Sequence, residues 1–558
     1  MTDNLVEIKN LTKTFPDEGT PAIDNITASI QKGKITGLVG PDGAGKTTLI
    51  RLITGLYLPT DGEIIVNADD IGYMPQKFGL YEDLSVQQNL DLYADLRGLE
   101  KSERKETFER LLKFTSLAPF IKRLAGKLSG GMKQKLGIAC ALISKPQLLL
   151  LDEPGVGVDP ISRRELWAMV QELLKDEITV LWSTAYLDEA AQCEEVLLLN
   201  NGKMLFEGKP QDLTDRMQGR VFMVKDHADN QRRLLRQVLK HEGVIDGVIQ
   251  GSSVRVLTSR DSDIKPNPKI IPAKPRFEDS FVDILGGGPG GESELANMIS
   301  SIEKSDKPLI EARNLTKMYG DFAAAKNINF SVKSGEIFGL LGPNGAGKST
   351  TFKMLCGLSR PTYGEAYVTG LNLETASGKA RAKIGYMAQK FSLYDHLSVM
   401  QNLKFFSGVY GLNGKEQKER IDDIINIFQF KKYLNINSGG LPLGFKQRLA
   451  LACAVMHEPE VLFLDEPTSG VDPITRREFW THINNMVEKG VTIMVTTHFM
   501  DEAEYCDRIS LIYKAESIAI GTPDELKNMA KTTENPDPTM EDAFIGLIEE
   551  NEKINSFN

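Results

Sequence analysis

The segment Gly40-Pro41-Asp42-Gly43-Ala44-Gly45-Lys46-Thr47 is a glycine-rich loop that ends in a lysine and a hydroxyl residue. The pattern returns as Gly342-Pro343-Asn344-Gly345-Ala346-Gly347-Lys348-Ser349. Glycines allow backbone angles that turn successive N–H groups toward phosphate oxygens, and the positive end of a following helix faces the same anion. We expect the lysine of each loop to reach the β and γ phosphates of a nucleotide and the final hydroxyl to bind Mg²⁺.

An apolar strand pattern precedes each loop, at residues 35–39 and 337–341, and helical periodicity follows it. A phosphate site of this kind requires the order strand, loop, helix. Strands buried on both faces read as continuous apolar runs, so a buried parallel sheet is expected in each half. The predicted fold class is α/β.

Two further apolar runs each end in the sequence Asp-Glu-Pro. A charge at the end of a buried strand needs a partner, and a metal ion bound to phosphate is one. We expect the aspartates, Asp152 and Asp465, to hold Mg²⁺, commonly through water. The glutamates that follow, Glu153 and Glu466, are the candidate catalytic residues that polarise the attacking water.

A third motif, Leu128-Ser129-Gly130-Gly131-Met132-Lys133-Gln134, narrows the class, together with Gly-Tyr-Met-x-Gln segments that end at Gln76 and Gln389. With these motifs the chain resembles the ATP-binding cassette (ABC) ATPases, over nearly everything except residues 221–308. The resemblance implies two nucleotide-binding domains, each with a mixed sheet and a helical subdomain, and ATP and Mg²⁺ as cofactors.

The resemblance also assigns site residues. Phe15 and Tyr319 are similar to the aromatic residues that stack on adenine in this family. The residues expected to bind ATP are Phe15, Gly40, Pro41, Asp42, Gly43, Ala44, Gly45, Lys46, Thr47, Thr48, Ser129, Gly130, Gly131, Tyr319, Gly342, Pro343, Asn344, Gly345, Ala346, Gly347, Lys348, Ser349 and Thr350. Those expected at Mg²⁺ are Thr47, Gln76, Asp152, Ser349, Gln389 and Asp465.

In this family two cassettes face each other head-to-tail, and each ATP lies between the glycine-rich loop of one and the signature of the other. Two departures therefore matter. The second signature reads Leu441-Pro442-Leu443-Gly444, where proline lacks an N–H and leucine replaces a glycine. In the first half Ala185 stands where the second half has His498. The resemblance implies that both losses fall on one pocket.

One consensus site is thus expected, with Lys348, Glu466 and His498 completed by the signature 129–131. The other site would mainly hold ATP. Because the first half retains Glu153, slow turnover in that weaker site is compatible with the sequence. Two unrelated tolerated substitutions would leave the same pattern.

The remaining sequence suggests five segments. Strand patterns at 221–224 and 254–257 surround a helical stretch at 231–241, and a glycine-rich run at 286–291 marks a linker. The echo of Glu-Asp-x-Phe at 278–281 and 541–544 indicates that both halves end alike. The expected segments are a first domain at 5–220, a small α+β appendix at 221–285, a flexible linker at 286–308, a second domain at 309–532 and a C-terminal tail at 533–558.

Composition limits the partners and the cellular location that can be expected. The 558 residues carry 66 basic and 76 acidic side chains, a formal charge of −10, which makes nucleic acid a poor partner. No stretch approaches the roughly 20 apolar residues of a membrane span, and the N-terminus lacks a secretory pattern. Five scattered cysteines fit a reducing compartment, and six histidines lack ligand-like spacing.

Lys-Phe-x-Leu-Tyr follows each glutamine, at 77–81 and 390–394. In transport ATPases of the family this surface receives a short helix of the membrane subunit. In detail the chain is similar to ATP-binding subunits of ABC-2-type exporters of drugs or lipids. That resemblance implies two integral membrane permease subunits docking near Gln76 and Gln389, no nucleic acid, and a location at the cytoplasmic face of the bacterial inner membrane.

Three alternatives remain open at this point. A tandem-cassette ATPase of a sugar importer also fuses two copies. A soluble cassette protein acting on ribosomes should have a long basic helical pair between its cassettes, and residues 221–308 instead mix strands, prolines and glycines. A DNA-repair or chromosome-organising ATPase should carry zinc modules or long heptad repeats, which this sequence lacks.

Overall fold

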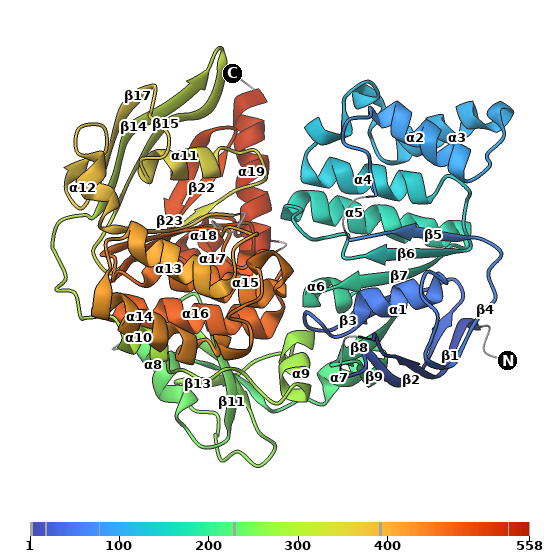
Figure 1. Cartoon of the computed structure of the whole chain (residues 1–558), viewed down its shortest axis with the longest axis horizontal. Helices are drawn as coiled ribbons and strands as arrows, with labels where there is room; N and C mark the ends of the chain where they lie inside the picture. Colours follow the sequence, from blue (N-terminus) through green and yellow to red (C-terminus); the bar gives the residue numbers. More distant parts are fainter. Residues whose placement is uncertain are drawn as a thin grey trace. The chain divides into compact units, whose positions relative to one another are not determined.

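The computed structural model describes residues 4–16, 19–76, 79–226, 230–389, 393–533 and 535–556. The chain forms two compact units, each an α/β assembly (Figure 1). The first consists of Met1–Gly219, Lys274–Gly287 and Gly470–Pro473, and the second of Arg220–Ala273, Gly288–Ser469 and Ile474–Asn558.

The centre of the first unit is a six-stranded sheet in the order β5-β6-β7-β3-β8-β9. Its first five strands run parallel, and β9 pairs antiparallel with β8. Strand β6 is buried along its whole length, as its run of leucines predicts. The strands are β3 (Ile35–Val39), β5 (Ile71–Met74), β6 (Leu148–Asp152), β7 (Thr179–Thr184), β8 (Glu195–Asn200) and β9 (Lys203–Gly208).

Helices and a smaller antiparallel sheet surround this centre. The small sheet has the order β2-β1-β4, and α2, α3 and α4 gather beyond strand β5 as a helical subdomain (Figure 1). The elements are β1 (Asn4–Lys13), β2 (Ile23–Gln31), β4 (Asp61–Val66), α1 (Lys46–Ile53), α2 (Val86–Leu96), α3 (Lys101–Phe114), α4 (Gly130–Ala141), α5 (Pro160–Leu173), α6 (Leu187–Ala190) and α7 (Pro210–Asp215).

The second unit repeats this plan with a sheet in the order β19-β20-β21-β16-β22-β23 and a small sheet in the order β15-β14-β17-β18. The strands are β14 (Ile310–Tyr319), β15 (Phe322–Val332), β16 (Ile337–Leu341), β17 (Tyr363–Val368), β18 (Leu371–Asn372), β19 (Ile384–Met387), β20 (Val461–Asp465), β21 (Thr492–Thr497), β22 (Arg508–Tyr513) and β23 (Glu516–Gly521). The helices are α11 (Lys348–Leu355), α12 (Ser377–Arg381), α13 (Val399–Val409), α14 (Gly414–Ile427), α15 (Leu443–Val455), α16 (Pro473–Glu488), α17 (Met500–Ala503), α18 (Pro523–Met529) and α19 (Met540–Ser556).

The appendix is a four-stranded antiparallel sheet, ordered β11-β12-β10-β13, with helix α8 packed on β11 and β12. It belongs to the second unit because Arg232 of α8 donates two hydrogen bonds of 2.9 Å to Asp507 and one of 3.2 Å to Asn484. Its elements are β10 (Val221–Val224), α8 (Gln231–Leu239), β11 (Val244–Gln250), β12 (Ser253–Thr258) and β13 (Ile270–Pro272).

The structure ends the appendix earlier than the sequence suggested. Residues 274–287 group with the first unit, and α9 (Phe277–Ile284) packs on α6 and α7. In the second unit α19, which begins at Met540, packs in the same way on α17 and α18. The two Glu-Asp-x-Phe segments thus begin equivalent closing helices, and the appendix is an insertion ahead of the first one.

The segment at 286–308, expected as a flexible linker, groups with the second unit from Gly288 onward and contacts it. It contains a short helix, α10 (Glu294–Asn297), and Ser293 Oγ lies 2.8 Å from His482 Nδ1. Asn485 of α16 donates a hydrogen bond of 3.1 Å to the carbonyl of Gly291. Glycine composition lowers the preference for regular structure, but it leaves main-chain groups free to bind such side chains.

Among the described residues, no helix combines the length and apolar character that crossing a bilayer requires. The five cysteines are buried and free.

Candidate functional site

The glycine-rich loops have a backbone that only glycine supports. Gly45 and Gly347, which precede α1 and α11, have φ of +104° and +107°. A Cβ on Gly45 would lie 2.6 Å from the carbonyl oxygen of Ala22, and one on Gly347 would lie 2.4 Å from that of Ala324. Each loop therefore keeps its N–H groups and the start of its helix directed at one point, as a phosphate cradle requires.

The loop lysines are buried and folded over their own loops. Lys46 Nζ donates hydrogen bonds of 2.8 Å and 3.2 Å to the carbonyls of Gly40 and Pro41. Lys348 Nζ makes the matching bonds of 2.6 Å and 3.1 Å to Gly342 and Pro343. Both ammonium groups thus lie at the mouth of the loop, where phosphate oxygens can replace the carbonyls as acceptors.

In the second unit three expected residues, Gln389, His498 and Lys348, act on the carboxylate of Glu466. Gln389 Nε2 donates a hydrogen bond of 2.8 Å to Glu466 Oε2, and His498 Nδ1 lies 3.3 Å from the same oxygen. Burial alone would raise the pKa of Glu466, but the hydrogen bond and charge of His498, with the charge of Lys348, lower that pKa to about 2. Glu466 is therefore ionised at neutral pH and can orient a water molecule.

The first unit brings together the equivalent residues without the histidine. Gln76 Nε2 donates a hydrogen bond of 2.5 Å to Glu153 Oε2, and Lys46 Nζ lies 3.4 Å from Glu153 Oε1. Ala185, at the position of His498, is buried and offers no side-chain donor. Glu153 and Glu466 have nearly equal φ of +54° and +47°, so the two sites share their backbone and differ in chemistry.

The aspartates ahead of the glutamates fit a magnesium site. Burial raises the pKa of Asp152 to about 6, while the hydroxyl of Thr47 lowers it in part. Burial also raises the pKa of Asp465, to which Thr496 Oγ1 donates a hydrogen bond of 2.5 Å. A buried carboxylate that resists ionisation gains from a nearby cation, and a hydroxyl with an acid is a ligand set suited to Mg²⁺ beside phosphates. Thr47 with Asp152, and Ser349 with Asp465, would hold it.

The two signature segments differ at the start of their helices. Ser129 caps α4, because its Oγ accepts a hydrogen bond of 3.3 Å from Met132 N. A Cβ on Gly131 would lie 2.8 Å from that of Ser162. In the second unit Pro442 precedes α15 and makes no side-chain cap. The first signature therefore presents a serine hydroxyl, which can still donate, followed by two consecutive glycines, and the roles of Ser129, Gly130 and Gly131 at ATP stay a prediction.

Of the two candidate adenine aromatics, Tyr319 ends strand β14 of a small sheet, and Phe15 lies two residues after strand β1. Phe15 contacts Tyr57 edge-on, with ring centroids 5.5 Å apart, and Tyr319 is 59% exposed. Lys13 and Lys317 lie over these rings at 5.3 Å. Both rings are accessible in part, and stacking on adenine stays a prediction.

Sequence reasoning missed a buried glutamate that supports the turn carrying His498. Thr497 Oγ1 donates a hydrogen bond of 2.6 Å to Glu502 Oε2 and accepts one of 2.9 Å from Phe499 N. In the first unit Thr184 and Glu189 make the same bond at 2.6 Å. Burial raises the pKa of both glutamates to about 7. The signal was available in the repeated Asp-Glu-Ala motif, but only packing shows what it supports.

An exposed tyrosine follows each glutamine five residues later in the sequence. Tyr394 contacts Phe405 edge-on at 4.8 Å, and these rings are 50% and 42% exposed. In the first unit Tyr81 is 57% exposed. Residues 77–78 and 390–392, part of the expected docking surface, lie outside the described residues. We call the exposed side chain of Tyr81 in the first unit, and those of Tyr394 and Phe405 in the second, the glutamine-side patches.

The two loops, the strand-end acids and the signatures define a tandem pair of ATP-binding cassettes, and the protein is an ATPase. The family model for "ABC transporter" matches residues 23–156 and 325–469, so the chain belongs to the ABC transporter family.

Relatives extend this likeness to the full length. The chain is 57% identical over 576 aligned residues to a "Probable multidrug ABC transporter ATP-binding protein YbhF" of Escherichia coli (strain K12), covering 100% of both. It is 40% identical over 223 residues to the "Linearmycin resistance ATP-binding protein LnrL" of Bacillus subtilis (strain 168), covering 39% of this chain and 70% of the relative. A solved "ATP binding subunit of ABC transporter" is 27% identical with a TM-score of 0.40 and covers 43% of this chain and 99% of the solved one.

Proposed function

We propose that this chain is the ATP-hydrolysing subunit of an ABC-2-type exporter and that only one of its two nucleotide sites turns over rapidly. The observation that carries the proposal is the environment of the two glutamates. Glu466 is buried beside His498 and Gln389, whereas Glu153 lies beside Lys46 and Gln76 with Ala185 at the histidine position.

At the site of Lys348, which we propose to be the faster one, each residue has a separate role. Lys348 and the N–H groups of its loop bind the β and γ phosphates, and Mg²⁺ supplies positive charge that offsets the charge of the phosphates. Ionised Glu466 accepts a hydrogen bond from the attacking water and directs it toward the γ phosphate. Gln389 holds the carboxylate in position, and His498 donates to the charge that develops on the phosphate.

Slow turnover at the Lys46 site is inferred from the head-to-tail pairing of cassettes that is typical of the family. In that pairing Ser129–Gly131 completes the site of Lys348, and the segment at Pro442 completes the site of Lys46. A proline without an N–H and an alanine without a donor both weaken the hold on the γ phosphate at the Lys46 site. That site then mainly retains ATP, and Glu153 supports slow turnover.

The transport role is supported by the glutamine-side patches and by the relatives. Patches of exposed aromatic rings suit a short helix from another subunit. We infer two permease subunits, one at each patch, with the chain at the cytoplasmic face of the bacterial inner membrane. The names of the relatives, multidrug and linearmycin resistance, favour export of drug-like molecules over sugar import.

The test is an affinity pull-down of the full chain from detergent-solubilised membranes of its own cell, with Tyr394→Glu as the matched variant. We expect integral membrane proteins to be recovered with the wild-type chain and reduced with the variant, because a buried unpaired carboxylate opposes docking. Recovery of ribosomes or DNA without an integral membrane protein would overturn the transport role. Recovery of an external sugar-binding protein would favour import.

A further inference from the structure

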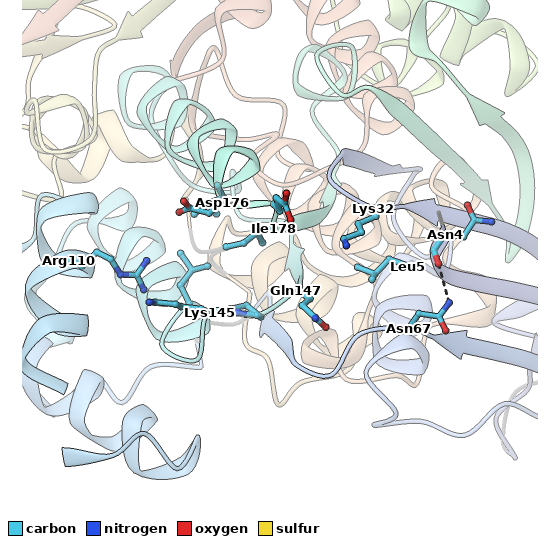
Figure 2. A pocket seen from close by; sticks show the side chains of 13 residues that line it. Asn4, Leu5, Lys32, Asn67, Arg110, Lys145, Gln147, Asp176 and Ile178 are labelled. Atoms are coloured by element: carbon cyan, nitrogen blue, oxygen red, sulfur yellow. Dashed lines mark hydrogen bonds between the residues drawn. The ribbon is translucent and has the colours of Figure 1, made fainter. Parts of the chain in front are cut away.

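A cavity of about 610 Å³ lies in the first unit, away from the glycine-rich loop. Gln147 and Ile178, which line it (Figure 2), directly precede strands β6 and β7, whereas the loop follows the carboxyl end of β3. The cavity therefore lies at the opposite edge of the central sheet from the nucleotide. Its volume falls within the roughly 300–1,000 Å³ typical of ligand sites.

Three cations from separate elements border this cavity. Lys32 precedes β3, Arg110 lies on α3 and Lys145 follows α4 (Figure 2). None of the three makes an ion pair with any residue in the described part of the chain. The acidic residues on the same wall are Asp176 and Glu177, so the formal charge of the lining is 3 − 2 = +1. The cavity thus favours an occupant that brings negative charge.

The second unit has a region equivalent to this cavity. Matching hydrogen bonds in the two units show which residues correspond. Thr179 N donates a 3.0 Å bond to Gln147 O, as Thr492 N does to Glu460 O. Gly33 N donates a 2.9 Å bond to Thr179 Oγ1, as Gly335 N does to Thr492 Oγ1. Counting from these pairs, Glu458 corresponds to Lys145, and Gly490 corresponds to Glu177.

The chain's own segment at 298–302 occupies the region in the second unit, and it is held through its main chain. Ile302 N donates a hydrogen bond of 2.7 Å to Lys489 O, and Ser300 N donates one of 2.9 Å to Glu458 Oε2. Arg420, which forms an ion pair with Glu458, donates a hydrogen bond of 3.1 Å to Met298 O. The region is therefore built to take a polypeptide segment without helix or strand.

Two differences between the halves indicate that the cavity of the first unit prefers a different kind of segment from the one bound in the second unit. Lys145 has φ of +50° and Glu458 has φ of +53°, so the same backbone carries the opposite charge. A Cβ on Gly490 would lie 2.3 Å from the carbonyl oxygen of Ile302, and Glu177 has such a Cβ. A segment in the first unit must therefore pass farther from Glu177, on the side of the three cations.

We propose that this cavity binds an acidic, irregular segment of a partner polypeptide, in the way that the second unit binds residues 298–302. Main-chain groups of the segment lie along the loop at 176–178, and its carboxylates face Lys145, Arg110 and Lys32. The site is independent of the nucleotide sites and of the transported molecule.

The test uses two capped, fluorescein-labelled peptides with the sequence of residues 298–307, one with Ser300→Glu and one with Ser300→Lys. Fluorescence anisotropy with the full chain at low salt measures binding. We expect the S300E peptide to bind at least about fivefold more tightly than the S300K peptide, because position 300 faces Lys145 in place of Glu458.

Three variants locate the binding. Lys145→Glu, which the backbone of Glu458 shows to be tolerated, should reverse the preference between the two peptides. Glu177→Gly should tighten the binding of both peptides, because it reopens the path that Gly490 allows. Lys105→Glu, an exposed charge change on α3 outside the cavity, should leave the preference intact.

Two results would overturn the proposal. One is equal or absent binding of the two peptides to both the wild-type chain and the Glu177→Gly variant. The other is a preference that Lys105→Glu reduces as much as Lys145→Glu, which would show attraction to overall charge and not to this cavity.

Discussion

Glu153 and Glu466 directly follow equivalent strands with nearly equal φ, and a glutamine donates a hydrogen bond to each of them. They differ in one neighbour, because His498 lies beside Glu466 and Ala185 takes that position in the first unit. The same fold therefore carries both sites, and the side chain at one position differs. A loop and a strand-end acid identify a nucleotide site in each cassette, and we propose that the histidine separates rapid hydrolysis from retention of ATP.

The largest expected effect is that of Glu466→Gln. Removing an ionised carboxylate that orients water should reduce steady-state ATPase by about 10²-fold or more. The matched change Glu153→Gln should cost less than about threefold. Phosphate release from purified chain at saturating Mg-ATP measures both, and equal losses would remove the proposed asymmetry.

His498→Ala should lower the turnover number by about 10- to 10²-fold, the scale of a charge-assisted hydrogen bond of about 1.5–3 kcal/mol. The reverse change, Ala185→His, should alter activity less than about twofold, because the signature at Pro442 would still be poor. A large gain from Ala185→His would show that the missing imidazole alone limits the first site.

Glu502→Gln tests whether Glu502, through Thr497, holds the turn that carries His498. Weakening the bond to Thr497 should lower kcat about two- to tenfold with little change in KM, the scale of a neutral hydrogen bond. Glu189→Gln in the first unit should have almost no effect on kcat. If both variants lower kcat equally, or if both only lower thermal stability, the glutamate serves the fold and not the histidine.

The smallest effect concerns Asp42, which stands where the second loop has Asn344. Burial raises the pKa of Asp42 to about 7, and Lys46 lowers it in part. The carboxyl group is neutral below that pH and ionised above it, where it repels phosphate. In a Lys348→Ala background, ATP affinity without Mg²⁺ should fall roughly two- to fivefold from pH 6 to pH 8. Asp42→Asn should flatten this dependence, and an unchanged slope would contradict the assignment.

Much of each site followed from the sequence because its residues are local to strand ends and loops. The glycines of the loops, the strands before them and the strand-end acids lie where periodicity placed them. The resemblance placed both glutamines at Mg²⁺, which stays a prediction. Their hydrogen bonds to the glutamates, Gln389 to Glu466 and Gln76 to Glu153, become visible only in the structure.

The features that could not be predicted from the sequence depend on packing between segments that are distant in the chain. The association of Arg232 with Asp507 joins residues far apart in the chain, and composition alone made 286–308 a free linker. Comparing the halves reveals that Lys145 replaces Glu458, but the cavity beside it becomes visible only when three elements are assembled.

The most direct measurement is the location of the product nucleotide during turnover. The full chain is trapped with Mg²⁺, vanadate and a photoreactive azido-ATP, and the cross-linked peptides and bound nucleotides are then identified. We predict about one ADP per chain, cross-linked to the peptide that contains Tyr319, with ATP on the peptide that contains Phe15. Equal amounts of ADP on the two peptides would contradict the division into one rapid and one retaining site.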